Sequence, residues 1–292
     1  MQLPKFTYFT PATIEDASSL LLKYRGEARV LAGGTDLLVK MKNRRMLPSC
    51  LINIKSIPDL DYIRVDEQNA LHIGALVTLE PIKNSPVVQQ KFSVLAQAAG
   101  AVGSTAIRNV ATIGGNLCNA SPSADTAPAL LAIGAKVTLA SPDGKRTMAL
   151  ADFFTGPGNT VLQPGEILIE IEVPHPPAKS AGVYLKHSLR QMDIAAVGVA
   201  VTVVLHGETC ADVRIIMGAV APTPLRASKA EAVVRGKIPN QDLVRLAGEI
   251  AAGEAHPIDD IRSSAAHRRE VTGMLVAQAI EQAIDRARRM GP

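Results

Sequence analysis

The sequence predicts an α+β fold in three parts, the last being a three-stranded antiparallel sheet with helices. Residues 1–55 alternate helical and strand-like segments around a Gly-Gly pair. Residues 56–175 mix helical stretches with alternating apolar patterns, which are typical of half-exposed strands. Residues 176–292 place three strand-like runs before three helical ones, the order of a two-layer α+β unit. We therefore predict an N-terminal subdomain, a middle subdomain and a C-terminal domain with these bounds.

The first part is predicted to begin with a helix. Thr13 is an N-cap residue followed three positions later by Asp16, and apolar residues follow until Gly26 ends the pattern. The next predicted elements are a buried strand, a helix with Asp36 near its N-cap and a second strand, at residues 28–32, 37–43 and 51–54.

The middle part is predicted to be a sheet with several helices. Strands are expected at residues 62–65, 70–75, 136–140 and 167–173, and helices at residues 78–82, 87–101 and 121–131. The run Pro174-His175-Pro176-Pro177 can be neither helix nor central strand, so it ends this part.

The last part has its strands first. They are expected at residues 183–188, 195–205 and 213–219, and helices follow at residues 225–234, 241–252 and 263–289. The final helix carries an apolar stripe with a period close to 3.6, formed by Val271, Met274, Leu275, Ala279, Ala283 and Ala287.

Composition excludes several function classes. The chain has 292 residues, 47% of them hydrophobic and 20% charged, which is typical of a globular protein. A net charge of +4, 3% aromatic residues and no Trp argue against a nucleic-acid partner, which needs a basic face and stacking side chains. Three widely spaced cysteines predict neither a disulfide framework nor a metal site.

The expected environment is the reducing cytoplasm. The first residues have no apolar core of a signal peptide, and no run reaches the ~18 apolar residues of a membrane span. Cys118 invites two readings, a redox thiol or a small buried residue, and the buried residue is favoured.

Two stretches share one design, in which an apolar run leads into a Gly-Gly pair and then into small polar residues. Glycine lets a ligand approach main-chain N–H groups, and successive N–H groups form an anion-binding nest. Either pair alone is more simply an ordinary turn, but two copies favour one site, and a ligand that bridges both would need two negative centres or one extended diphosphate. The candidate residues are Val30, Leu31, Ala32, Gly33, Gly34, Thr35, Asp36 and Leu37 in the first stretch and Thr112, Ile113, Gly114, Gly115 and Asn116 in the second.

Side chains near these stretches have different expected roles. Asp36 would repel a diphosphate, so we expect it to turn away and cap backbone N–H groups. Thr112 and Asn116 can donate hydrogen bonds without that penalty. Asp125 is either an acceptor for ribose or ribityl hydroxyls or the cap of its own helix. Neither the Gly-x-Gly-x-x-Gly fingerprint nor a Walker A motif is present.

Together these motifs resemble the two flavin-binding loops of one family, the FAD-binding medium subunits of the molybdenum hydroxylases. Bacterial xanthine dehydrogenase and aerobic carbon monoxide dehydrogenase are members. The resemblance covers essentially the whole chain and includes residues 119–125, 154–158, 192–195 and 218–224. Several motifs in the right order are far more specific than any one of them.

The resemblance implies a fold and a site. The fold would be a two-part FAD-binding unit of the PCMH/vanillyl-alcohol-oxidase type, followed by the C-terminal α+β domain. FAD would lie between the first two parts, its diphosphate held by main-chain N–H groups of both loops. Asp125 would bind FAD, Leu168 would touch the flavin through its backbone, and Lys186 would lie near the isoalloxazine. At position 102, where animal members place a Phe against the flavin, this chain has Val102.

The resemblance also implies electron transfer. Electrons would pass from [2Fe-2S] clusters of an iron–sulfur small subunit through FAD to an acceptor such as NAD or a quinone, after a molybdopterin large subunit has oxidised the substrate. The assembly would be a dimer of heterotrimers, with no catalytic side chain and no metal in this chain. Two alternatives stay open: a self-sufficient flavin oxidase or reductase of the same fold, and an assembly module that has lost FAD.

Overall fold

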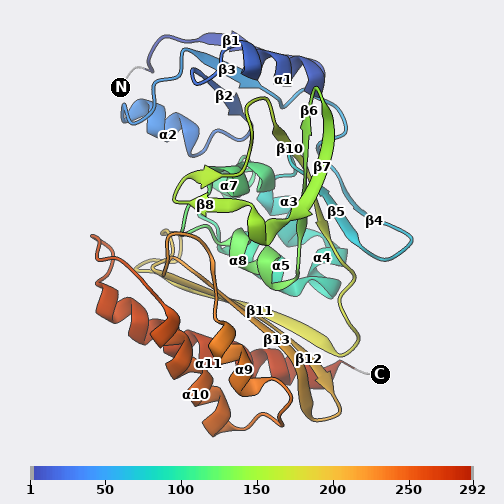
Figure 1. Ribbon diagram of the computed structural model, residues 1–292, viewed down its shortest axis with the longest axis vertical. Coiled ribbons are helices and arrows are strands. Elements are labelled where there is room, and N and C mark those ends of the chain that lie inside the picture. Colours follow the sequence, from blue (N-terminus) through green and yellow to red (C-terminus); the bar gives the residue numbers. More distant parts are fainter. Residues whose placement is uncertain (1–2, 291–292) are drawn as a thin grey trace.

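The computed structural model describes residues 3–290 and contains three principal sheets, which follow one another along the long axis of the molecule in chain order (Figure 1). The N-terminal sheet lies at one end, the C-terminal sheet with its helices at the other, and the middle sheet with six helices between them. The predicted α+β class is confirmed.

The first sheet is parallel, with strand order β1-β3-β2. Thr13 caps the first helix, because its hydroxyl accepts a hydrogen bond from the Asp16 N–H at 3.0 Å, as the sequence predicts. The elements are β1 (Thr7–Phe9), α1 (Ile14–Lys23), β2 (Ala28–Leu31), α2 (Leu37–Lys42) and β3 (Cys50–Asn53). The first strand, β1, was not predicted.

The middle sheet is antiparallel, with strand order β4-β5-β10-β6-β7. Its strands are β4 (Ile63–Val65), β5 (Leu71–Gly74), β6 (Lys136–Ser141), β7 (Gly144–Ala149) and β10 (Ile167–Val173). The helices are α3 (Leu79–Asn84), α4 (Pro86–Lys91), α5 (Ser93–Ala101), α6 (Thr105–Arg108), α7 (Ile113–Asn119) and α8 (Thr126–Ala132). A 3-10 turn (Leu150–Asp152) and a small hairpin of β8 (Phe154–Gly156) and β9 (Asn159–Thr160) complete this part.

Two helix predictions in this region were wrong in extent. The single helix expected over residues 87–101 is broken at Phe92, which leaves the helical region (φ −129°, ψ 44°) and buries its ring in the core. The helix expected from Ser121 begins only at Thr126. Burial of a large side chain and the Pro-containing lead-in outweigh local helix propensity here.

The second Gly-Gly pair lies in a helix and not in a loop after a strand, which corrects the sequence prediction. Thr112 is the N-cap of α7 and accepts the Gly115 N–H at 3.1 Å, so Gly114 and Gly115 form the first helical turn. The residues before the pair form only an isolated bridge, between Thr78 and Thr112.

The C-terminal sheet is antiparallel in the order β11-β12-β13-β14. Its elements are β11 (Ser180–His187), β12 (Val197–His206), β13 (Thr209–Gly218), β14 (Leu225–Arg226), α9 (Ser228–Val234), α10 (Gln241–Glu254) and α11 (Ala265–Arg289). The short strand β14 takes the place of the predicted helix start at Leu225. Met274 is 67% exposed, so its assignment to the buried stripe of the last helix was wrong.

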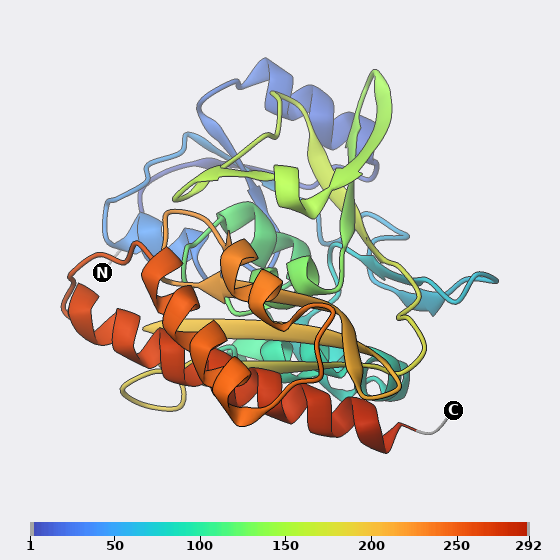
Figure 2. The ribbon, with the colours of Figure 1, turned by 60° about the horizontal axis from the view of Figure 1, so that its bottom comes forward.

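Helices cover both faces of this sheet. Helices α9, α10 and α11 pack on one face and form a large apolar core with it (Figure 2). Helices α5 and α8 of the middle part pack on the other face, where a second cluster consists of Val94, Ala98, Ala129, Ala132, Tyr184, Ala200 and Ile216. This contact places β11 against α5, and β12 and β13 against α8, the helix that follows the second Gly-Gly pair. Within residues 3–290, none of the helices combines the length and apolarity that a membrane crossing demands.

Candidate functional site

A cavity of about 620 Å³ lies between the first Gly-Gly loop, α7 and the end of β11. That volume is within the range of small-molecule and cofactor sites, about 300–1,000 Å³. Every predicted site residue except Leu31 and Ile113 lines it. Those two side chains are buried in the hydrophobic core instead.

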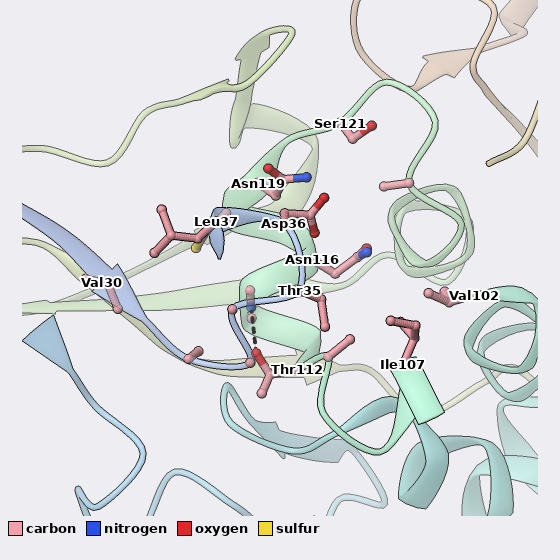
Figure 3. Close-up of a pocket in the computed structure, with 18 of the residues that line it drawn as sticks. Val30, Thr35, Asp36, Leu37, Val102, Ile107, Thr112, Asn116, Asn119 and Ser121 are labelled. Carbon is pink, nitrogen blue, oxygen red and sulfur yellow. Dashed lines mark hydrogen bonds between the residues drawn. The ribbon is translucent and has the colours of Figure 1, made fainter. Parts of the chain in front are cut away.

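The first Gly-Gly loop offers unpaired main-chain donors. Within the part of the chain that the structure describes, the N–H groups of Gly33, Gly34, Thr35 and Asp36 have no hydrogen-bond partner. Gly34 has φ +75°, a conformation that favours glycine. All four residues line the cavity, and Figure 3 shows the loop passing beside Thr112 and Asn116. Four successive free N–H groups are what an anion-binding nest requires.

Gly33 is also fixed by packing. A Cβ atom on this residue would lie 2.2 Å from the Val110 carbonyl oxygen, a contact that no side chain can make. The loop therefore rests directly against the segment that leads into α7, and only glycine permits the approach.

The second Gly-Gly pair contributes differently from what the resemblance implied. The N–H groups of the pair and of the residue before it are already bonded: Ile113 donates to the Val77 carbonyl, Gly114 to the Ala75 carbonyl and Gly115 to the Thr112 hydroxyl. The donors left over are side chains. Asn116 Oδ1 accepts from Thr126 Oγ1 at 2.6 Å, which leaves the Asn116 NH₂ group to donate.

Asp36 and Asp125 both precede helices, yet neither caps one. Asp36 makes no capping hydrogen bond, so the expectation that it caps backbone N–H groups was wrong. Both residues have helical backbone angles, whereas an N-cap needs an extended backbone to turn its side chain back over the helix end. The alternative reading of Asp125 as a helix cap is thereby excluded.

Asp125 is instead bound by two side chains of strand β11. Its Oδ1 accepts from the Tyr184 hydroxyl at 2.6 Å, and its Oδ2 accepts from Lys186 Nζ at 3.1 Å. Lys186 Nζ also donates to the Ala101 carbonyl at 2.9 Å. Burial raises the pKa of the Asp125 carboxyl, while Lys186 and Tyr184 act in the opposite direction. Burial and the neighbouring carboxylate raise the pKa of the Tyr184 phenol.

Several residues of the cavity were not identified from the sequence. Lys40, one helical turn after Asp36, donates from Nζ to Asn119 Oδ1 at 2.6 Å and so links α2 to α7 at the cavity. Its spacing from the Gly-Gly pair was the available signal. An apolar wall completes the lining, with Val102 and Ile107 on the side away from Val30 in Figure 3.

Two further candidates from the sequence, Leu168 and Cys118, also lie at the cavity. Leu168 is buried in β10 beside an irregularity of strand register between Leu168 and Glu170, and it lines the cavity. Cys118 also lines the cavity, but burial raises the pKa of its thiol to about 12, so it stays protonated and is no thiolate nucleophile. Among residues 3–290, no cluster of three His, Cys, Asp or Glu side chains is placed to hold a metal ion.

Two family models match the chain. One, described as the FAD binding domain in molybdopterin dehydrogenase, matches residues 4–176, and the other, described as the CO dehydrogenase flavoprotein C-terminal domain, matches residues 183–283. The chain belongs to the FAD-binding medium subunits of the molybdenum hydroxylases.

Similar proteins agree with this membership over the full length. The carbon monoxide dehydrogenase medium chain of Hydrogenophaga pseudoflava is 33% identical, with 96% of this chain and 97% of that one covered. The xanthine dehydrogenase FAD-binding subunit of Escherichia coli O157:H7 is 31% identical, with 95% and 96% covered. A solved structure of carbon monoxide dehydrogenase from Hydrogenophaga pseudoflava gives a TM-score of 0.95 at 35% identity, covering 98% of this chain and 99% of that one.

The resemblance seen in the sequence is thus confirmed, and so is FAD as the cofactor of this subunit. Both curated relatives are named as one chain of a larger enzyme, and the matching family models describe flavoprotein domains. The protein is a subunit of a multi-subunit oxidoreductase, in which the molybdenum and iron–sulfur cofactors belong to other chains. Nothing among these relatives supports a self-sufficient oxidase.

Proposed function

We propose that FAD lies in the cavity with its diphosphate on the first Gly-Gly loop. The observation that carries this assignment is the run of four unpaired N–H groups at Gly33–Asp36. Thr112 at the N-cap of α7, Asn116 within α7 and Lys40 on α2 border the same space and add side-chain donors. A diphosphate is a strong acceptor with negative charge, so N–H groups and one ammonium fit it well.

The flavin end is proposed to lie toward Asp125, Leu168 and Lys186. These residues line the cavity on the side of β10 and β11. FAD, when bound, supplies the two-electron and one-electron redox chemistry. Lys186 would place a positive charge near the reduced flavin, which becomes negatively charged. The buried ion pair with Asp125 holds the ammonium group in position. The apolar side chains of Val102, Ile107 and Ile194 line the same cavity and would exclude water from the ring once FAD is bound.

In the complex, the chain would pass electrons between subunits. We infer that an iron–sulfur small subunit delivers them and that a molybdopterin large subunit oxidises the organic substrate, in a dimer of heterotrimers in the cytoplasm. NAD or a quinone would be the external acceptor. This inference is supported by the family membership.

The test is purification of the native complex through a tag on this chain. We expect flavin absorption bands together with iron and molybdenum in the metal analysis. Flavin without metals, with turnover of an added organic substrate, would favour a self-sufficient enzyme. A colourless protein that fails to take up added FAD would refute the assignment.

A further inference from the structure

Strand β11 of the C-terminal sheet directs two side chains of one face at Asp125, and one of them, Lys186, also lines the cavity. Tyr184 and Lys186 are two residues apart, so both point to the same side of the sheet. That side packs against α5 and α8. Both side chains donate to the Asp125 carboxylate, which lies directly before α8.

The Tyr184 hydroxyl occupies a niche that fits it closely. The residue is 6% exposed, and its ring packs among small side chains of α5 and α8. Gly198 on the neighbouring strand faces the hydroxyl, and a Cβ atom there would lie 2.7 Å from Tyr184 Oη. The hydroxyl therefore has room only because residue 198 is glycine.

Asp125 retains acceptor capacity beyond these two bonds. An ionised carboxylate has about four lone-pair sites on its two oxygens. Tyr184 and Lys186 each use one site, on different oxygens. Asp125 lines the cavity, so the remaining sites are available to a ligand hydroxyl.

We propose that Tyr184 is a positioning residue of the FAD site, which holds Asp125 in the orientation and charge state that accept a hydrogen bond from the flavin nucleotide. The proposal rests on the proposed placement of FAD in this cavity. It also gives the C-terminal sheet an indirect part in FAD binding, because Tyr184 belongs to β11 and acts through Asp125.

Lys186 is the charged residue that influences the pKa of Asp125. Helices α5 and α8 contain no charged residue, and α7 contributes only the Cys118 thiol as a titratable group. On β11, Lys186 and Tyr184 are the groups that oppose the effect of burial on the pKa of Asp125. The other charged residues that line the cavity are Arg29, Asp36, Lys40, Glu166 and Asp193. Loss of the Tyr184 hydroxyl thus removes one of two contacts that favour the ionised carboxylate.

The test compares FAD affinity of the full chain at two pH values, by titrating apo-protein with FAD and following flavin fluorescence. For the unchanged chain we expect nearly equal Kd values at pH 6 and pH 8. For Tyr184→Phe we expect weaker binding at both, and a Kd at least about fivefold larger at pH 6 than at pH 8, since Asp125 takes up a proton more readily. A purely structural loss would not create this pH dependence.

A second variant and a control complete the experiment. Gly198→Ala pushes the hydroxyl away while keeping it, so it should reproduce the weakening at pH 6 even where Tyr184→Phe fails to fold. Tyr62→Phe removes another tyrosine–carboxylate bond, to Glu170, outside this cavity, and should leave FAD affinity unchanged at both pH values. Equal Kd values and equal pH dependence in the unchanged chain, Tyr184→Phe and Gly198→Ala would overturn the proposal. An unchanged chain that binds no FAD would instead refute the proposed function.

Discussion

Two kinds of glycine occur in the Gly-Gly loop. Gly34 has a positive φ, so its backbone conformation favours glycine, whereas Gly33 lies so close to the Val110 carbonyl that no Cβ fits. Gly33 therefore determines how near the loop comes to α7, and with it the width of the cavity between them.

The first prediction concerns Gly33→Ala. The added methyl must displace backbone at Val110, so we expect a loss of at least about 1–3 kcal/mol in the free energy of unfolding and a sharp fall in bound FAD. Urea unfolding and the flavin content of purified protein measure both effects. Gly253→Ala is the matched control, because a Cβ at this exposed position of helix α10 meets no atom within 4 Å and should cost nothing. Undiminished flavin in Gly33→Ala contradicts the site.

A second prediction concerns Lys40, the cation that sequence reasoning missed. In Lys40→Gln the ammonium that faces the proposed diphosphate is lost, and we expect FAD Kd to rise about tenfold, equivalent to about 1.4 kcal/mol. The difference from the unchanged chain should shrink at high salt, since salt screens the lost attraction. Lys42→Gln in the same helix is the control, because Lys42 is exposed and outside the cavity. Equal affinities in the two variants would remove Lys40 from the site.

At the scale of elements, the two Gly-Gly segments differ in structure and in the donors that they present to the cavity. The first connects β2 to α2 and leaves its N–H groups free, whereas the second is the first turn of α7 and has its own bonded within the fold. The two similar sequences thus form two different structures: a loop with free N–H groups, and a helix start whose N–H groups are bonded and whose side chains face the cavity.

Strands β4, β5 and β10 gather a charged cluster away from the cavity. His72 Nε2 lies 3.0 Å from Asp66 Oδ2, and its Nδ1 lies 3.3 Å from Glu170 Oε1. Burial by itself lowers the pKa of His72, but the two carboxylates outweigh burial and raise it above its ordinary value of 6.5. The protonated ring is therefore more favoured in the folded protein than in the unfolded chain.

The third prediction follows from the sign of that shift. A raised pKa in the folded state gives stability that is complete below pH 6.5 and is lost as the pH rises through the folded value. We expect the free energy of unfolding to decline from pH 6 to pH 9, and His72→Asn to remove that part of the decline. Urea unfolding at several pH values measures it, with exposed His206→Asn as the control. Identical pH slopes in His72→Asn and the unchanged chain would disprove the assignment.

On the scale of the whole molecule, the cavity is lined by residues between Arg29 and Ile194. The first loop, the helices of the middle part and the end of β11 all border it, and the C-terminal sheet is fixed to the middle part through the cluster around Tyr184. A ligand in this space contacts residues from both family-model regions, so its binding should stabilise the chain as a unit.

The fourth prediction is that FAD binding stabilises the whole chain against unfolding. FAD at about 100 times its Kd should add about 2.7 kcal/mol to the free energy of unfolding. The unfolding transition should shift as a whole in a urea titration followed by circular dichroism. Riboflavin at the same concentration lacks the diphosphate and should shift it far less. Two transitions, only one of which responds to FAD, would show that the C-terminal sheet takes no part in the site.

The sequence by itself determined the α+β class, the main strands and helices, the family, and a set of site residues of which all but Leu31 and Ile113 line the cavity. These depend on local signals, such as the Thr13 cap, the Gly-Gly pairs, and motifs whose order along the chain is specific. Only the tertiary structure decided which N–H groups are free, why Asp36 and Asp125 cap nothing, and that Lys40 borders the cavity.

The sequence could not reveal these contacts because the residues that make them are far apart along the chain. Tyr184 and Lys186 are about 60 residues from Asp125, Lys40 is 79 from Asn119, and the Val110 carbonyl that fixes Gly33 belongs to another part of the fold. Helix caps and hydrophobic periods act over a few residues and can be recognised in sequence. A hydrogen bond or a close contact between distant segments exists only after packing has placed them together.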